Sequence, residues 1–148
     1  MIEPVEVNEL PEIMALIEYT VAESVDADAD EKPSLLQNIR QNLDWWSQHR
    51  DQAVHLKFSV HGRIVGVVLV KNFWNLCNLF VAPAQHGQGI GRALTFAAIE
   101  RCRGKTERPA LRLNSSRNAV GFYEGIGFVR TVTDTPPPQG CTPLEHKF

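Results

Sequence analysis

A chain of 148 residues with a formal net charge of −2 has the size of one ordinary domain and lacks the strong positive charge of nucleic-acid-binding proteins. Its composition, 43% apolar and 22% charged, is that of a globular domain, and no apolar run approaches the roughly 20 residues of a membrane helix. We therefore expect one domain over residues 1–148, with neither nucleic acid nor membrane as a partner.

The cysteines, the histidines and the first residues bear on location and metal content. Cys77, Cys102 and Cys141 have no C-x-x-C spacing, which is typical of reduced thiols in a cytoplasmic protein. The first ten residues carry three glutamates and no apolar signal core, so we expect no secretory signal and a cytoplasmic location. The five histidines lack metal-ligand spacing, and no metal site is expected.

The first third of the chain predicts a strand and two helices. Residues 2–7 form the strand, and Pro11 fits the first turn of a helix whose apolar positions follow the helical period. Residues 23–31 contain five carboxylates and are expected to form a loop. It is either simply solvated, or its carboxylates attract a cationic acceptor.

The second helix resumes at Pro33 with Ser34-Leu35-Leu36-Gln37 as a capping-box pattern. Its apolar stripe includes Trp46, whereas Trp45 and Trp74 are candidates for a substrate pocket or a dimer face.

Strands dominate the middle of the chain. Residues 53–60 alternate between apolar and polar, residues 63–71 are almost continuously apolar, and His61-Gly62 supplies the hairpin turn between them. A third apolar run, residues 76–81, has the length of a buried strand, and Pro83 ends it because proline has no amide hydrogen for a sheet.

The last third continues with alternating elements. A helix is expected from Gly89 to about Lys105, followed by a strand over residues 110–113 and a short helix over residues 119–126. Gly127 is the expected left-handed cap of that helix. Two more strands are predicted at residues 128–133 and 142–147, separated by a proline-rich loop. The element order predicts a mixed α/β sheet flanked by helices.

A glycine loop joins the strand at 76–81 to the next helix. Gly87, Gly89 and Gly91 alternate and are followed by Arg92. Glycine lets a ligand approach the main chain, and a helix start presents unpaired amides and a positive dipole end, so this loop predicts a phosphate or diphosphate site. The Walker and dinucleotide patterns both fail here, because Arg92-Ala93 follows the last glycine.

The stretch His86-Gly87-Gln88-Gly89-Ile90-Gly91 resembles the acetyl-CoA loop of the GNAT acyltransferases, usually written Gln/Arg-x-x-Gly-x-Gly/Ala, with His86 at the Gln/Arg position. Residues 116–128 are similar to the family's second signature, Asn-x-x-Ala-x-x-x-Tyr-x-x-x-Gly-Phe. Ala119, Tyr123 and the final Gly-Phe pair are in register, and Ser116 stands where asparagine is frequent.

This resemblance implies the GNAT fold: a central, mostly antiparallel sheet of six or seven strands, flanked by about four helices and splayed between the fourth and fifth strands. It also implies acetyl-CoA as co-substrate, with the pantetheine arm along the strand and a main-chain amide near Phe80 or Val81 as oxyanion donor. The residues expected at the co-substrate are Leu79, Phe80, Val81, Gly87, Gln88, Gly89, Ile90, Gly91, Arg92, Ser116 and Asn118.

Tyr123 is the candidate catalytic residue, as general acid to the CoA thiolate. Its alternative role is a packed tyrosine whose hydroxyl is bonded to the backbone. No cysteine or serine lies in a nucleophile setting, so the implied reaction is direct transfer of acetyl to a primary amine of a small molecule or peptide.

Several points stay open at this level. No general base is assigned, because the strands that carry one in some relatives have no acid here; a water relay, Glu23 or Asp26 are the options. The acceptor, the preferred acyl chain and the oligomeric state, for which a homodimer is one option, are not determined. The alternatives are a non-catalytic acyl-CoA-binding module, a transferase of another acyl-CoA, and a phosphate-binding protein of unrelated chemistry.

Overall fold

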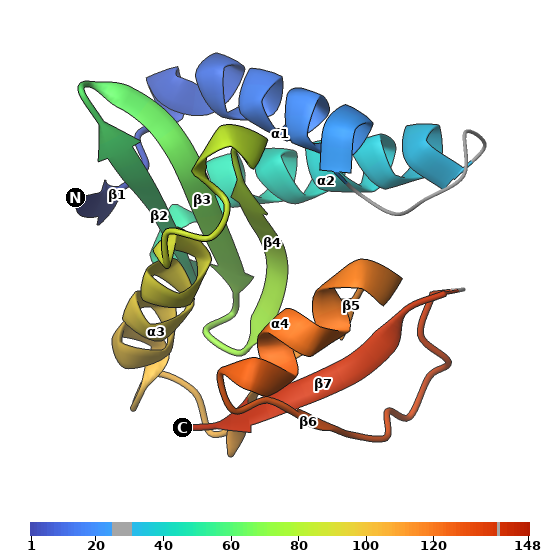
Figure 1. Ribbon diagram of the computed structural model, residues 1–148. Coiled ribbons are helices and arrows are strands. Elements are labelled where there is room, and N and C mark those ends of the chain that lie inside the picture. Colours follow the sequence, from blue (N-terminus) through green and yellow to red (C-terminus); the bar gives the residue numbers. More distant parts are fainter. Residues whose placement is uncertain (25–30, 139) are drawn as a thin grey trace.

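The computed structural model describes residues 1–24, 31–138 and 140–148, and within them the chain forms a seven-stranded sheet flanked by four α-helices (Figure 1). The strands are β1 (Ile2–Pro4), β2 (Ala53–Val60), β3 (Arg63–Lys71), β4 (Asn75–Val81), β5 (Ala110–Ser115), β6 (Val129–Arg130) and β7 (Thr142–Lys147). The helices are α1 (Leu10–Ser24), α2 (Glu31–Gln48), α3 (Ile90–Cys102) and α4 (Val120–Gly125).

The sheet has the order β1-β2-β3-β4-β5-β7-β6, and all neighbours are antiparallel except β4 and β5. In the described residues one pair, Asn75 with Arg112, joins these two parallel strands. Beyond that pair β4 and β5 have no further paired residues in the described ranges, so the two strands diverge. The predicted fold, including the splay between the fourth and fifth strands, is confirmed.

A β-bulge lies where β4 leaves β5. Leu69 of β3 pairs with Asn78, whereas Val70 pairs with Leu76, so Cys77 is an extra residue in β4. The Cys77 thiol donates to the Leu69 carbonyl oxygen, with a sulfur–oxygen distance of 3.6 Å. Because a bulge bends its strand and increases the local twist, it gives a physical cause for the divergence of the two strands.

Helices cover both faces of the sheet. On one face α1 and α2 pack over β3 and β4 and enclose a core that includes Ile13, Ile17 and Trp46. On the other face α3 packs over β2, β3 and β4, and its core includes Leu94 and Leu111 (Figure 1). None of the helices in the described ranges combines the length and the apolar character needed to cross a bilayer.

Several predicted boundaries were wrong: α3 ends at Cys102 and not near Lys105, β5 extends to Ser115, and three further differences have visible causes. The first strand ends at Pro4, because Glu6 and Glu9 form a capping box, with the Glu6 amide donating to the Glu9 carboxylate at 2.8 Å, that starts a 3₁₀ turn. Helix α2 begins at Glu31, so Ser34 lies inside the helix and does not cap it. The strand predicted at residues 128–133 is only β6, and Val132 beyond it is 88% exposed.

The acidic loop expected over residues 23–31 is shorter than predicted, because residues 23 and 24 belong to α1 and Glu31 begins α2, and residues 25–30 lie outside the described residues. Glu23 and Glu31, on either side of these residues, are exposed.

Candidate active site

The glycine loop has the backbone geometry that its sequence predicts. Gly87 and Gly89 have φ angles of 81° and 79°, values that favour glycine over residues with a side chain. Gly89 is the N-cap of α3, and because glycine has no side chain it cannot cap the amides of the first helical turn. The amides of the first turn, Ile90 to Arg92, therefore have no partner within the helix and lie at its positive end.

A cleft of about 710 Å³ opens between this loop, β4, the end of β5 and α4. The cleft follows the divergence of β4 and β5, and a diverging strand leaves main-chain groups on its edge without a neighbouring strand. All the predicted co-substrate and catalytic residues except Gln88 line it: Leu79, Phe80, Val81, Gly87, Gly89, Ile90, Gly91, Arg92, Ser116, Asn118 and Tyr123. Gln88 is exposed and does not line the cleft.

The direction of the β4 main chain decides which groups face the cleft. The Ala82 amide, just after β4, donates to the carbonyl oxygen of Val65 on the neighbouring strand β3 at 2.8 Å. Because successive residues of a strand direct their amides to opposite edges, the amides of Val81 and, two residues earlier, Leu79 point away from β3. Consistent with this, His86 reaches the Val81 carbonyl from the loop, with Nε2 donating at 2.7 Å.

Tyr123 lies at the inner wall of the cleft, 7% exposed. Its ring contacts Phe122 and Phe128 edge-on, with centroid distances of 5.1 Å and 5.3 Å. Burial raises the pKa of the Tyr123 phenol, so the hydroxyl keeps its proton at neutral pH. A protonated phenol beside a cleft is chemically suited to donate a proton.

Charge in the cleft is concentrated at the loop. Arg92, with its guanidinium 5.4 Å from the Phe96 ring centroid, is the only arginine, lysine or carboxylate residue among the described lining residues. Glu23, one option for a base, is exposed and does not line the cleft, and Asp26 lies outside the described residues. No group of His, Cys, Asp or Glu in the described ranges could hold a metal ion.

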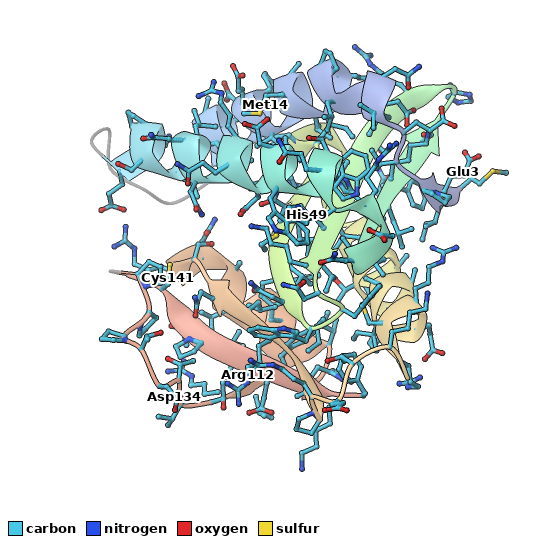
Figure 2. The ribbon with its side chains drawn as sticks, turned by 180° about the vertical axis from the view of Figure 1, so that it is seen from behind. Glu3, Met14, His49, Arg112, Asp134 and Cys141 are labelled. Carbon is cyan, nitrogen blue, oxygen red and sulfur yellow. The ribbon has the colours of Figure 1, made fainter. Side chains whose placement is uncertain are left out.

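Several lining residues were missed by sequence reasoning. Thr20 and Leu35 come from α1 and α2 on the opposite side of the sheet, and Cys141 precedes β7 on the side of the molecule nearer α2 (Figure 2). Their position depends on tertiary packing, so no local pattern indicates them. Phe122 did carry a signal, because it precedes Tyr123 within the second signature.

Two lining thiols have a raised pKa. Burial raises the pKa of Cys77 to about 12, and it also raises that of Cys141. Both thiols are therefore protonated at neutral pH and unsuited as nucleophiles.

Trp45 and Trp74 do not line the cleft. Trp45 stacks on His49, and the Arg108 guanidinium lies 3.6 Å from the Trp74 ring centroid. Trp46 is buried in the core, as predicted.

Solved structures with the same fold cover the whole chain. The PaiA N-acetyltransferase from Thermoplasma acidophilum, in complex with coenzyme A, superposes with a TM-score of 0.78 at 20% identity, covering 100% of this chain and 98% of that one. A GCN5-related N-acetyltransferase from Rhodopseudomonas palustris has a TM-score of 0.80 at 18% identity, covering 100% and 95%. At these identities the likeness establishes the fold.

Sequence comparisons give the family. Mycothiol acetyltransferase from Kineococcus radiotolerans is 39% identical over 57 residues, which is 38% of this chain and only 19% of the relative. The family model described as "Acetyltransferase (GNAT) domain" matches residues 28–142. This range contains the glycine loop, the cleft-facing strand edge and Tyr123, and the chain belongs to the GNAT family of acetyltransferases.

Proposed function

We propose that this protein transfers the acetyl group of acetyl-CoA directly to a primary amine of a small molecule or peptide, with Tyr123 as general acid. The observation that carries the proposal is the shared cleft: the loop amides, the open edge of β4 and the buried Tyr123 phenol all border it. Support for the co-substrate comes from the neighbour solved in complex with coenzyme A.

In this proposal the diphosphate of CoA binds the amides of Gly87 to Arg92, where the helix dipole favours negative charge. The pantetheine arm lies against the edge of β4 as an added strand. The direction of the Ala82 amide favours Leu79 and Val81 over Phe80 as donors to the arm and to the oxyanion. Ser116 and Asn118 border the same cleft from the turn that precedes α4.

The chemistry is one addition and one elimination. The amine nitrogen attacks the thioester carbonyl carbon, a C–N bond forms, and the carbon–sulfur bond then breaks. The thiolate leaves as it takes the phenolic proton of Tyr123, the amine loses one proton to water, and water returns a proton to the Tyr123 phenolate before the next turnover. We assign no side-chain base, because the described lining residues include no carboxylate.

The test compares the two tyrosines of the chain. Tyr123→Phe removes the phenolic proton, and Tyr19→Phe is the control because Tyr19 is 59% exposed on α1. We expect Tyr123→Phe to bind CoA as the wild type does but to lose roughly 10²- to 10⁴-fold in kcat, measured by thiol release with a panel of amines. The assigned role would be contradicted if Tyr123→Phe kept its activity, or if Tyr19→Phe lost activity as well.

One alternative has an observation in its favour. The lack of a carboxylate among the described lining residues also fits a non-catalytic acyl-CoA-binding module. That module would bind CoA more tightly than ATP and release no thiol with any amine of the panel. Running the panel with acetyl-CoA and propionyl-CoA also tests the acyl preference.

A further inference from the structure

A buried pair of asparagines joins helix α2 to strand β4. Asn42 Nδ2 donates to Asn78 Oδ1 at 3.1 Å. The two side chains are 6% and 1% exposed. The side-chain nitrogen of Asn78, Nδ2, is also buried, and it has no hydrogen-bond partner in the described part of the chain.

This pair is not explained by its contribution to stability. A buried donor without a partner costs free energy, and two apolar side chains of similar shape would fill the same space without that cost. Asparagine and leucine are close in shape. Ile39 and Leu43, buried with Asn42 on α2, and Leu69, the β3 partner of Asn78, are already apolar. A polar pair kept in such a place is better suited to hold two elements in one fixed position.

The hydrogen bond between Asn42 and Asn78 lies next to the bulge of β4. Asn78 directly follows the extra residue Cys77 and directly precedes Leu79, whose main chain borders the cleft. The Cys77 thiol holds the same bulge by its bond to the Leu69 carbonyl. Helix α2, which supplies Asn42, also supplies Leu35 to the cleft wall.

We propose that Asn42 and Asn78 are positioning residues: their hydrogen bond fixes the bulge of β4 and, with acetyl-CoA binding as proposed above, sets the Leu79 and Val81 main-chain groups against the thioester arm. The pair touches neither substrate nor reacting atoms. Its effect passes through the strand edge, where a misplacement of one ångström is enough to cost about 100-fold in rate.

The experiment separates position from stability with three variants, Asn42→Leu, Asn78→Leu and the double substitution. Each single variant leaves one buried amide without its partner and lowers the unfolding midpoint, whereas the double variant leaves none and recovers it. We expect CoA affinity and kcat to fall about 10- to 100-fold in all three, without recovery in the double variant.

His55→Leu is the matched control. His55 is 5% exposed on the same face of the sheet, and neither of its ring nitrogens has a hydrogen-bond partner in the described residues. It lies on β2, away from the cleft, so its replacement should leave CoA affinity and kcat unchanged. Hydrogen exchange of the Leu79 and Val81 amides, with and without CoA, reports the strand edge directly and needs no turnover.

The outcomes are distinct. If the double variant regains both stability and wild-type CoA affinity, the pair is only structural and the inference is overturned. If the wild type itself fails to bind CoA, the proposed function fails instead. Weak CoA binding by a double variant of wild-type stability supports the positioning role.

Discussion

His86 Nε2 lies 2.7 Å from the carbonyl oxygen of Val81, so a side chain of the glycine loop is bonded to the last residue of β4. The two parts of the proposed CoA site, loop amides and strand edge, are thereby held together. This bond also occupies one cleft-side carbonyl of the strand, which leaves the Leu79 carbonyl as the more open acceptor for an amide of the pantetheine arm.

We therefore predict that His86→Ala weakens CoA binding about fivefold, the equivalent of one hydrogen bond of about 1 kcal/mol. His86→Gln should bind nearly as well as the wild type, since its amide can donate to the same carbonyl. Titration calorimetry with CoA measures both, and His61→Asn, at an exposed turn position with a φ of 51° that asparagine tolerates, is the control. Equal affinity of His86→Ala and wild type would mean that the bond does not organise the loop.

Gly91 and Phe122 are predicted to be coupled. A Cβ atom at Gly91 would lie 3.2 Å from Phe122 Cζ, so Gly91→Ala must displace that ring within the cleft. We expect lower CoA affinity for Gly91→Ala, and a smaller additional loss when Phe122→Leu is already present. A CoA titration of both single variants and the double variant measures this coupling. Additive losses would show that the effect of Gly91→Ala does not act through the Phe122 ring.

Substitution of Gly89 is expected to be unfavourable for a different reason. A Cβ there meets no atom within 4 Å, but the φ of 79° is unfavourable for alanine. Gly89→Ala should therefore cost about 1 kcal/mol in stability, and Phe122→Leu should not change that cost, as thermal or urea unfolding will measure. A rescue of Gly89→Ala by Phe122→Leu would contradict this distinction.

Elements that local sequence patterns predict are present in the structure at the expected positions. The hairpin of β2 and β3 has its predicted bounds, because alternation fixes the strands and His61-Gly62 supplies the positive φ angles of the turn. Helix α3 begins at Ile90, one residue after the glycine that the pattern indicates. The cleft position of the glycine loop follows from the same local pattern.

The bulge at Cys77 could not be predicted in this way, because it depends on the register between β3 and β4. The same holds for Thr20 and Leu35, which reach the cleft from helices on the other face. Asn42 lies within the buried stripe of α2, at a position where the helical period predicts an apolar residue. Its partner, on a strand distant in sequence, is visible only in three dimensions.

The three cysteines should differ in reactivity. Burial raises the pKa of Cys102 to about 12, and this side chain is fully buried, whereas Cys141 is partly exposed at the cleft. We predict that iodoacetamide labels Cys141 first and Cys102 last, and that saturating CoA slows labelling of Cys141 and Cys77, as measured by peptide mass spectrometry. Cys102 is the internal control, and its labelling rate should not depend on CoA. Fast labelling of Cys102 would show that α3 opens readily.

The buried imidazole of His55 makes stability depend on pH. Its ring lies edge-on to Trp46 with a centroid distance of 4.4 Å, and burial lowers its pKa from 6.5 to about 3, with the Glu9 carboxylate acting weakly in the opposite direction. Between pH 6.5 and 3 the unfolded chain binds a proton here that the folded chain does not. Stability therefore rises with pH in this window and is lost as the pH falls.

From pH 7 to pH 5 the loss should be about 2 kcal/mol, given about 1.36 kcal/mol for each unit below the unfolded pKa. Urea unfolding of wild type and His55→Leu at the two pH values isolates this contribution, because every other titrating group is common to both proteins. The wild type should lose about 2 kcal/mol more than the variant, and His61→Asn should behave like the wild type. If wild type and His55→Leu change equally, the folded protein must admit a proton to His55, which requires α2 to separate from the sheet at the point where Trp46 covers that ring.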